Sequence, residues 1–270
     1  MIDYSATDGE RLCNYINHRL LASSSWESLA LALAPTGRAS DLVDFYRELA
    51  AVTQTGRIVS AGRSLAEKVG AEGPELRKEF TALLREYFGI PSKLLDEFFR
   101  FSQRAVNAAL EPLQKSVQKE MEAWAVRNHT HCYMCSATLD FHDREQLNSY
   151  TCEHVWPRSY GGNSIPENFL PACSSCNSKK KANFATWVMP AIQSLVLGLA
   201  PGQDRLQEIH GSYKFSIHYR VAQRLASNRR ITLKNAFLQI GPWKDVRIRD
   251  IDDVVDIFNL ENHAPDIAVV

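Results

Sequence analysis

Two pairs of cysteines, each spaced by two residues, constrain this chain more than any other feature. Cys132 and Cys135 form the first pair, and Cys173 and Cys176 form the second. This spacing presents both sulfurs of a pair to one tetrahedral Zn²⁺, and two pairs complete a four-thiolate site. Because sulfur fills every position, we expect a closed, structural zinc site that stabilises a segment too short for a large apolar core.

The other two cysteines, Cys13 and Cys152, lack partners at such a spacing, and we expect them to be ordinary buried thiols. The first residues do not have the pattern of a signal peptide, and the apolar runs are too short to cross a bilayer. Paired cysteines in such a chain indicate metal binding in a reducing compartment. We therefore expect a cytoplasmic protein without a membrane-bound part.

The composition of the 270 residues favours a folded protein, since 45% are apolar and the formal net charge is zero. A neutral chain is not coated with basic surface for nucleic acid. The pattern changes along the chain and predicts an α+β, mostly α protein in three parts. We expect a helical region over residues 1–127, a cysteine-rich and histidine-rich domain over 128–188, and a helical or mixed region over 189–270.

In the first part, helices are predicted to begin near Ser40 or Asp41, Pro74, Pro91 and Pro112. Their apolar stripes either pack a core or bind a protein partner or a second copy of the chain. In the last part, alternation over 213–219 permits a short strand. Residues 219–249 form a basic block that either follows a phosphate backbone or neutralises the acidic residues of 250–270.

Chemically versatile residues lie between and beside the cysteine pairs. His154 is suited to act as a general base near neutral pH. Glu153 and Asn177 offer oxygen ligands for a hard divalent cation such as Mg²⁺. Basic side chains that could contact phosphates are Arg158, Lys179, Lys180 and Lys181.

At these residues the segment resembles the HNH endonuclease family, whose pattern includes an acidic residue before a histidine, a Gly-Gly turn, an asparagine, and a second cysteine pair. The matching residues are Glu153-His154-Val155, Pro157, Gly161-Gly162, Asn168-Phe169-Leu170 and Cys173-x2-Cys176-Asn177, followed by Lys179 and Lys180. The chain departs from the pattern with Asn177 for a common His, Glu153 for Asp, and Phe169 for Leu.

The resemblance implies a ββα-metal fold, a β-hairpin followed by a helix around one catalytic Mg²⁺ or Mn²⁺. In this fold His154 would activate water, and Glu153 and Asn177 would bind the cation. Asn168 would hold the loop that orients His154. The zinc at the four cysteines would be structural and separate from this catalytic cation.

The expected function is therefore hydrolysis of phosphodiester bonds in nucleic acid, with DNA favoured. By analogy, HNH nucleases with long flanking regions are found in restriction and anti-phage defence, where another protein controls them. Two alternatives remain open at this point. The zinc fold could be a catalytically silent module that binds nucleic acid or protein, or the helical regions could chiefly serve assembly.

Overall fold

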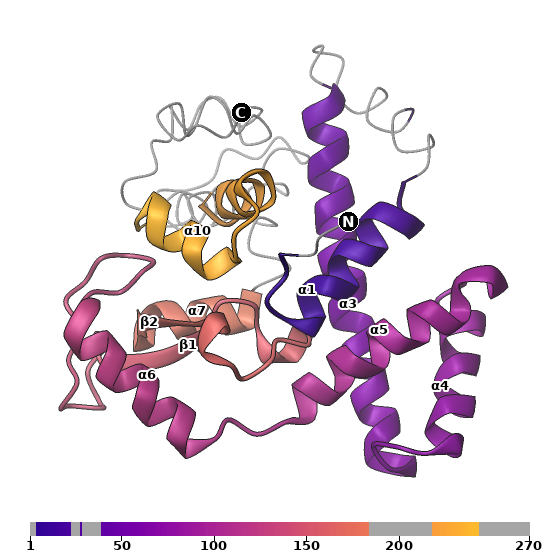
Figure 1. Ribbon diagram of the computed structural model, residues 1–270, viewed down its shortest axis with the longest axis horizontal. Helices are drawn as coiled ribbons and strands as arrows, with labels where there is room; N and C mark the ends of the chain where they lie inside the picture. Colours follow the sequence, from indigo (N-terminus) through magenta and orange to yellow (C-terminus); the bar gives the residue numbers. More distant parts are fainter. Residues whose placement is uncertain (1–3, 23–27, 29–38, 184–217, 243–270) are drawn as a thin grey trace, which may run out of the picture. The chain divides into compact units, whose positions relative to one another are not determined.

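The computed structural model describes residues 4–22, 28, 39–183 and 218–242, and Figure 1 shows the arrangement of their helices and strands. These residues are mostly helical, with a small two-stranded antiparallel sheet. The α+β, mostly α class predicted from the sequence is confirmed at this level. Within the described ranges, no helix combines the length and the apolar character needed to cross a membrane.

The contacts divide the chain into two units, which we describe separately. The first unit contains the described residues up to Gln114 together with Trp156–Asn168. The second contains Lys115–Val155 and the described residues from Phe169 onward. The segment 128–188 therefore contributes to both units, because its loop 156–168 belongs with the N-terminal helices.

The helices of the first unit largely follow the predicted pattern. The longest is described from Ala39 to Val69 and is much longer than the apolar stripe after Ser40 and Asp41 suggested. The next two begin at Pro74 and Ser92, close to the predicted positions. The elements are α1 (Asp8–Tyr15), η1 (Ile16–Leu20), α3 (Ala39–Val69), α4 (Pro74–Glu86) and α5 (Ser92–Leu110).

Local sequence explains two of these helix starts. Thr7 and Glu10 form a capping box at α1, in which the Thr7 main-chain N–H donates to Glu10 and the Glu10 N–H donates to the Thr7 hydroxyl. Pro74 occupies the first turn of α4, where a missing N–H costs nothing. Gly73 precedes it with a φ of 109°, a conformation that favours glycine.

Aromatic and small residues pack the core of the first unit. The rings of Phe80 on α4 and Phe99 on α5 meet edge to face, with centroids 5.9 Å apart. A Cβ at Gly62 of α3 would lie 2.4 Å from Val106 and 2.8 Å from Phe80, so only glycine lets these helices approach so closely. The apolar stripes of α3, α4 and α5 are thus used in internal packing.

The start of α1 is bonded to the loop 156–168, which contains η2 (Arg158–Tyr160) and η3 (Pro166–Asn168). The Gly9 N–H donates to the Gly161 carbonyl at 2.8 Å. Asp8 and Asn163 exchange two bonds, of 2.7 Å from the Asp8 N–H and 3.1 Å from the Asn163 amide. The N-terminal helix therefore holds a loop that lies about 150 residues further along the chain.

The second unit contains the sheet and the helices around it. Strand β1 pairs with β2 in antiparallel register, from Tyr150 opposite Cys173 to His154 opposite Phe169. The helix predicted from Pro112 begins at Lys115 instead. The elements are α6 (Lys115–Asn128), β1 (Tyr150–His154), β2 (Phe169–Cys173), α7 (Ser174–Asn183) and α10 (Leu233–Ile240).

The C-terminal predictions are only partly covered by the described residues. Residues 218–229 are helical, so Tyr219 is not in a strand, while 213–217 lie outside the described residues. In the basic block, Arg220 is buried and the Lys234 ammonium lies 4.3 Å from the ring centroid of Trp124. These two cations are used within the unit. The acidic residues of 250–270 also lie outside the described residues.

Candidate metal centre and nuclease site

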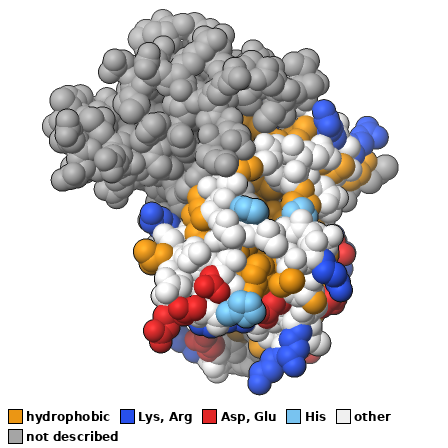
Figure 2. Space-filling model, turned by 90° about the vertical axis from the view of Figure 1, so that its left-hand side faces the viewer, with side chains coloured by type: hydrophobic (Ala, Val, Ile, Leu, Met, Phe, Trp, Pro, Cys, Tyr) orange, Lys and Arg blue, Asp and Glu red, His pale blue; other side chains and the backbone are white. Residues whose placement is uncertain are grey.

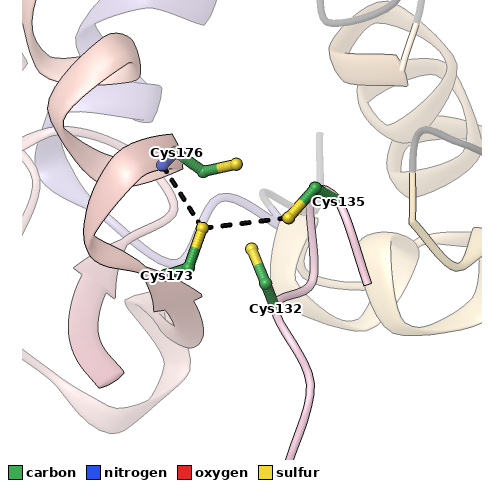
Figure 3. Close-up of side chains that lie close together, drawn as sticks. All are labelled: Cys132, Cys135, Cys173 and Cys176. Atoms are coloured by element: carbon green, nitrogen blue, oxygen red, sulfur yellow. Dashed lines mark hydrogen bonds between the residues drawn. The ribbon is translucent and has the colours of Figure 1, made fainter. Parts of the chain in front are cut away.

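The four paired cysteines come together in the second unit, with their sulfurs pointing toward one another (Figure 3). All four Sγ atoms lie within 4.8 Å of one another, and all four residues are free of disulfides. A tetrahedral site with Zn–S bonds of about 2.3 Å has sulfurs roughly 3.8 Å apart. The Cys135 and Cys173 sulfurs are 3.8 Å apart, so the donor set fits zinc.

Two different local structures present these sulfurs. The first pair lies on a tight turn, in which the Ser136 N–H donates to the Cys132 carbonyl and the Cys132 N–H donates to the Ala137 carbonyl. The second pair lies where β2 meets α7, and the Cys176 N–H donates to the Cys173 sulfur at 3.4 Å. A turn and a strand–helix junction thus face each other across the site.

The pKa values of the four clustered thiols shift in opposite directions. The hydrogen bond with Cys132 contributes most to lowering the pKa of Cys135, and it also lowers the pKa of Cys173 to about 7. The pKa values of Cys132 and Cys176 are raised in turn by bonds to neighbouring thiols. Thiolates are the form that binds zinc, and a bound cation deprotonates such ligands outright.

The two remaining cysteines lie outside this cluster. Burial raises the pKa of both Cys13 and Cys152 to about 12. Both therefore remain protonated near neutral pH, which agrees with the ordinary thiols expected from the sequence.

His154 is the last residue of β1 and is half-buried. Its ring lies against Phe169, the residue opposite it in β2, with centroids 4.4 Å apart. Because successive side chains of a strand point to opposite faces, His154 and Glu153 point away from one another. The large ring of Phe169, which departs from the family pattern, forms one wall beside the histidine.

Glu153 is held inside the second unit by Lys180 and Tyr133. The Lys180 ammonium donates to Glu153 Oε1 at 2.8 Å, and the Tyr133 hydroxyl donates to Oε2 at 2.9 Å. Lys180 is 0% exposed and Glu153 is 4% exposed. Burial raises the pKa of Tyr133 well above its ordinary value, which keeps this hydroxyl protonated as a donor. Burial lowers the pKa of Lys180, and the charge of Glu153 opposes that shift.

Lys180 also bonds to the main chain around His154. Its ammonium donates to the His154 carbonyl at 2.7 Å and to the Val155 carbonyl at 2.7 Å. The ladder between β1 and β2 ends at His154, so the carbonyls beyond it need other partners. A lysine side chain from α7 supplies them.

These contacts bear on the predicted cation ligands. Each carboxylate oxygen of Glu153 already accepts a hydrogen bond, and the neighbouring ammonium would repel a second cation. Asn177 lies half-buried on α7. The arrangement does not favour Glu153 as a ligand for a cation that must also reach a substrate, whereas Asn177 is compatible with that role.

Asn168 is buried at the end of the loop 156–168, in the first unit. Its Oδ1 accepts from the Trp156 N–H at 2.7 Å, and its amide donates to the carbonyls of Trp156 at 3.0 Å and Asn163 at 2.9 Å. Asn168 thus uses both ends of its amide to close the loop that follows His154 in the chain.

The two glycines of this loop permit its sharp turn. Gly161 has a φ of 83°, and a Cβ there would lie 2.7 Å from that of Ala105. A Cβ at Gly162 would lie 2.0 Å from the Trp156 carbonyl oxygen, the same oxygen that accepts from Asn168. Glycine is therefore required at both positions, for different reasons.

The four basic residues predicted to contact nucleic acid differ in exposure. Arg158 and Lys179 are exposed, while the side chain of Lys181 lies outside the described residues. Lys180 is fully buried, which does not favour the phosphate contact predicted for it. On the face drawn in Figure 2, acidic and basic side chains of the described residues are interspersed and do not form a continuous basic area.

Tyr133 and the internal role of Lys180 were not identified from the sequence. One signal was available for Lys180, because it lies four residues after Cys176 on the same helix face. Since Cys176 points into the cysteine cluster, a residue four positions later also faces the interior. Tyr133 lies between the first two cysteines, and spacing alone does not show where its hydroxyl points.

Comparison with known protein families gives a match in the central segment. Residues 132–187 match a family model described as HNH endonuclease. No curated protein and no solved structure matches the chain. The matched residues begin at the first cysteine of the cluster and include His154, Asn168 and Asn177. With its four clustered cysteines, the segment 132–187 belongs to the HNH endonuclease family.

Proposed function

We propose that the chain is a metal-dependent HNH endonuclease that hydrolyses phosphodiester bonds in nucleic acid, with DNA favoured. In this proposal β1, β2 and α7 form a ββα-metal fold around the active site, and His154 is the general base. The observation that carries the proposal is the position of His154. It lies half-buried at the end of β1, where Lys180 donates to its carbonyl and to the carbonyl of Val155.

The proposed chemistry is hydrolysis by an activated water. His154 takes a proton from the water, and the resulting hydroxide attacks phosphorus. The bond from phosphorus to the leaving oxygen breaks, and that oxygen leaves with a proton from solvent. Phe169 restricts the ring of His154 from one side, which favours one orientation of the imidazole.

The proposal includes two kinds of metal. Zinc at the four cysteines stabilises the fold, since structural zinc contributes on the order of 10 kcal/mol or more. A catalytic Mg²⁺ or Mn²⁺ would stabilise charge on the leaving oxygen. As a ligand of this cation, Asn177 has better support from the structure than Glu153. Glu153 would have to bind through the lone pairs that Lys180 and Tyr133 leave unused.

The wider setting is also part of the proposal. Exposed Arg158 and Lys179 are suited to contact phosphates of the nucleic acid. A role in restriction or anti-phage defence, a cytoplasmic location, and a controlling protein partner or second copy rest on the family analogy alone.

The test is a cleavage panel with zinc-loaded protein, Mg²⁺ or Mn²⁺, and single- and double-stranded DNA and RNA. We expect cleavage of at least one substrate, and a loss of 10²-fold or more, as an order-of-magnitude estimate, in His154→Ala. His142→Ala is the matched control, since His142 is exposed in the same unit. Equal cleavage by wild type and His154→Ala would contradict the proposal and leave a zinc-stabilised binding module.

A further inference from the structure

Lys180 is a fully buried lysine in a segment where lysines were expected to face nucleic acid. Removing an ammonium from water is unfavourable unless hydrogen bonds and an opposite charge replace the solvent. Here Glu153 supplies the charge at 2.8 Å, and three oxygens of Tyr133, His154 and Val155 lie within 3.3 Å of the nitrogen. All of these groups belong to the second unit.

The bonds of Lys180 are concentrated at the residue proposed as general base. It contacts the side chain of the residue before His154, the carbonyl of His154, and the carbonyl of the residue after it. The sheet ladder ends at the same place. Without Lys180, the carbonyls of His154 and Val155 would lose the hydrogen bonds that its ammonium donates.

We infer that Lys180 is a positioning residue, which fixes the main chain on both sides of His154 and thereby directs the imidazole. In this role Glu153 is the permanent counter-ion of Lys180 and not a ligand of the catalytic cation. The inference rests on the proposed function, because it assigns Lys180 an effect on catalysis through His154. The contacts themselves are independent of what the protein cleaves.

Two alternative roles for Lys180 lead to different expectations. A phosphate-binding lysine must reach the substrate, and full burial prevents that. A lysine that serves stability alone could be replaced, together with Glu153, by an uncharged pair without loss of catalysis. Only the positioning role ties the pair to the turnover of the folded enzyme.

The experiment compares three changes in the full-length, zinc-loaded protein. Glu153→Gln with Lys180→Met removes both charges together, so neither group is left buried without its partner. Lys180→Arg keeps a cation and several donors. Tyr133→Phe is the matched control, since it removes the hydroxyl's bonds to Glu153 at 2.9 Å and from Lys180 at 3.3 Å but leaves the bonds from Lys180 to the carbonyls of His154 and Val155.

We expect kcat to fall on the order of 100-fold in the double variant, with KM changed by less than about 3-fold, because misplacing a catalytic group by about 1 Å has an effect of this size. Lys180→Arg should recover part of kcat, and Tyr133→Phe should retain nearly all of it. The Mg²⁺ concentration for half-maximal cleavage should stay within about 3-fold in the double variant, since in this role Glu153 does not bind the cation.

A second measurement does not depend on cleavage. In protein labelled with ¹³C-histidine, the ring resonance of His154, assigned by its loss in His154→Ala, should shift or broaden in the double variant and not in Tyr133→Phe. This readout also keeps the inference testable if the wild type cleaves nothing and the proposed function fails. Wild-type kcat and an unchanged resonance in a folded double variant would overturn the inference. A tenfold higher Mg²⁺ requirement would overturn the counter-ion role of Glu153.

Discussion

Replacement of Asn168 by Asp tests how the loop after His154 is held. The two side chains have the same shape, so packing is nearly unchanged. The carboxylate still accepts the Trp156 N–H, but it cannot donate to the carbonyls of Trp156 and Asn163. The variant therefore removes two donors from a buried site and adds a charge.

The magnitude follows from these two bonds. A buried carbonyl left without a donor costs about 1–3 kcal/mol, so two give roughly 2–6 kcal/mol before charge repulsion is counted. Since the free energy of unfolding of a protein is only about 5–15 kcal/mol, this cost is a large fraction of the total stability. With a urea slope of about 2 kcal/mol per molar, the unfolding midpoint should fall by at least about 1 M.

Urea unfolding of wild type and Asn168→Asp, followed by circular dichroism, measures the change. Asn107→Asp is the control, because it adds the same charge to the same unit at an exposed position of α5. The free energy of unfolding of Asn107→Asp should lie within about 0.5 kcal/mol of that of the wild type. The proposed function adds a second expectation, a lower kcat for Asn168→Asp under conditions in which it is folded.

An Asn168→Asp protein with the urea midpoint of wild type would refute this reasoning. It would mean that the hydrogen bonds of Asn168 contribute little or that solvent reaches the two carbonyls. If stability falls but kcat of the folded protein is unchanged, the loop stabilises the first unit without orienting His154.

Three further predictions concern the metal site, the glycine turn and a buried histidine. Removal of zinc by a strong chelator, or Cys135→Ser, should unfold the second unit, detected as loss of helical circular dichroism; native protein that contains no zinc by metal analysis would contradict this. Gly162→Ala should destabilise the loop by at least about 2 kcal/mol, because the new Cβ would lie 2.0 Å from the Trp156 carbonyl oxygen, and a midpoint equal to wild type would show that the loop relaxes freely. Burial lowers the pKa of His218 from 6.5 to about 4, so the folded protein favours the neutral imidazole. The contribution of His218 to the free energy of unfolding is therefore complete above about pH 6.5 and is lost as the pH falls toward 4. Between pH 7 and pH 5 the free energy of unfolding, measured with urea, should fall by about 2 kcal/mol more in the wild type than in His218→Gln. Parallel pH profiles of the two proteins would contradict this prediction.

Much of the site could be predicted from the sequence because its chemistry depends on residue type and short spacing. Two cysteine pairs predict a tetrahedral site, and the four sulfurs do lie within 4.8 Å of one another. A glycine pair predicts a sharp turn, and Gly161 does adopt a positive φ. Two helices begin at or beside a predicted proline, at Pro74 and Ser92, because the φ of proline is fixed near the helical value, whereas the helix predicted from Pro112 begins at Lys115.

The tertiary structure decided which groups of the segment face inward. Lys179 and Lys180 are neighbours with the same charge, yet one is exposed and the other fully buried, since successive helix positions differ in direction by about 100°. Whether the inward lysine meets solvent, phosphate or a carboxylate depends on the strand packed beside it. Here that strand presents Glu153, and the resulting ion pair changes the expected role of both residues.

The sequence by itself predicted the family, the four cysteines suited to bind zinc and the histidine suited to act as a base, because each depends on chemical identity along a short stretch of chain. Only the tertiary structure decided that the loop after His154 belongs with the N-terminal helices and that a buried lysine holds the main chain at His154. Both of these depend on contacts between distant residues, such as the bonds from Asp8 to Asn163 and from Lys180 to Val155. Such contacts are selected by the packing of the whole unit, and no local pattern specifies them.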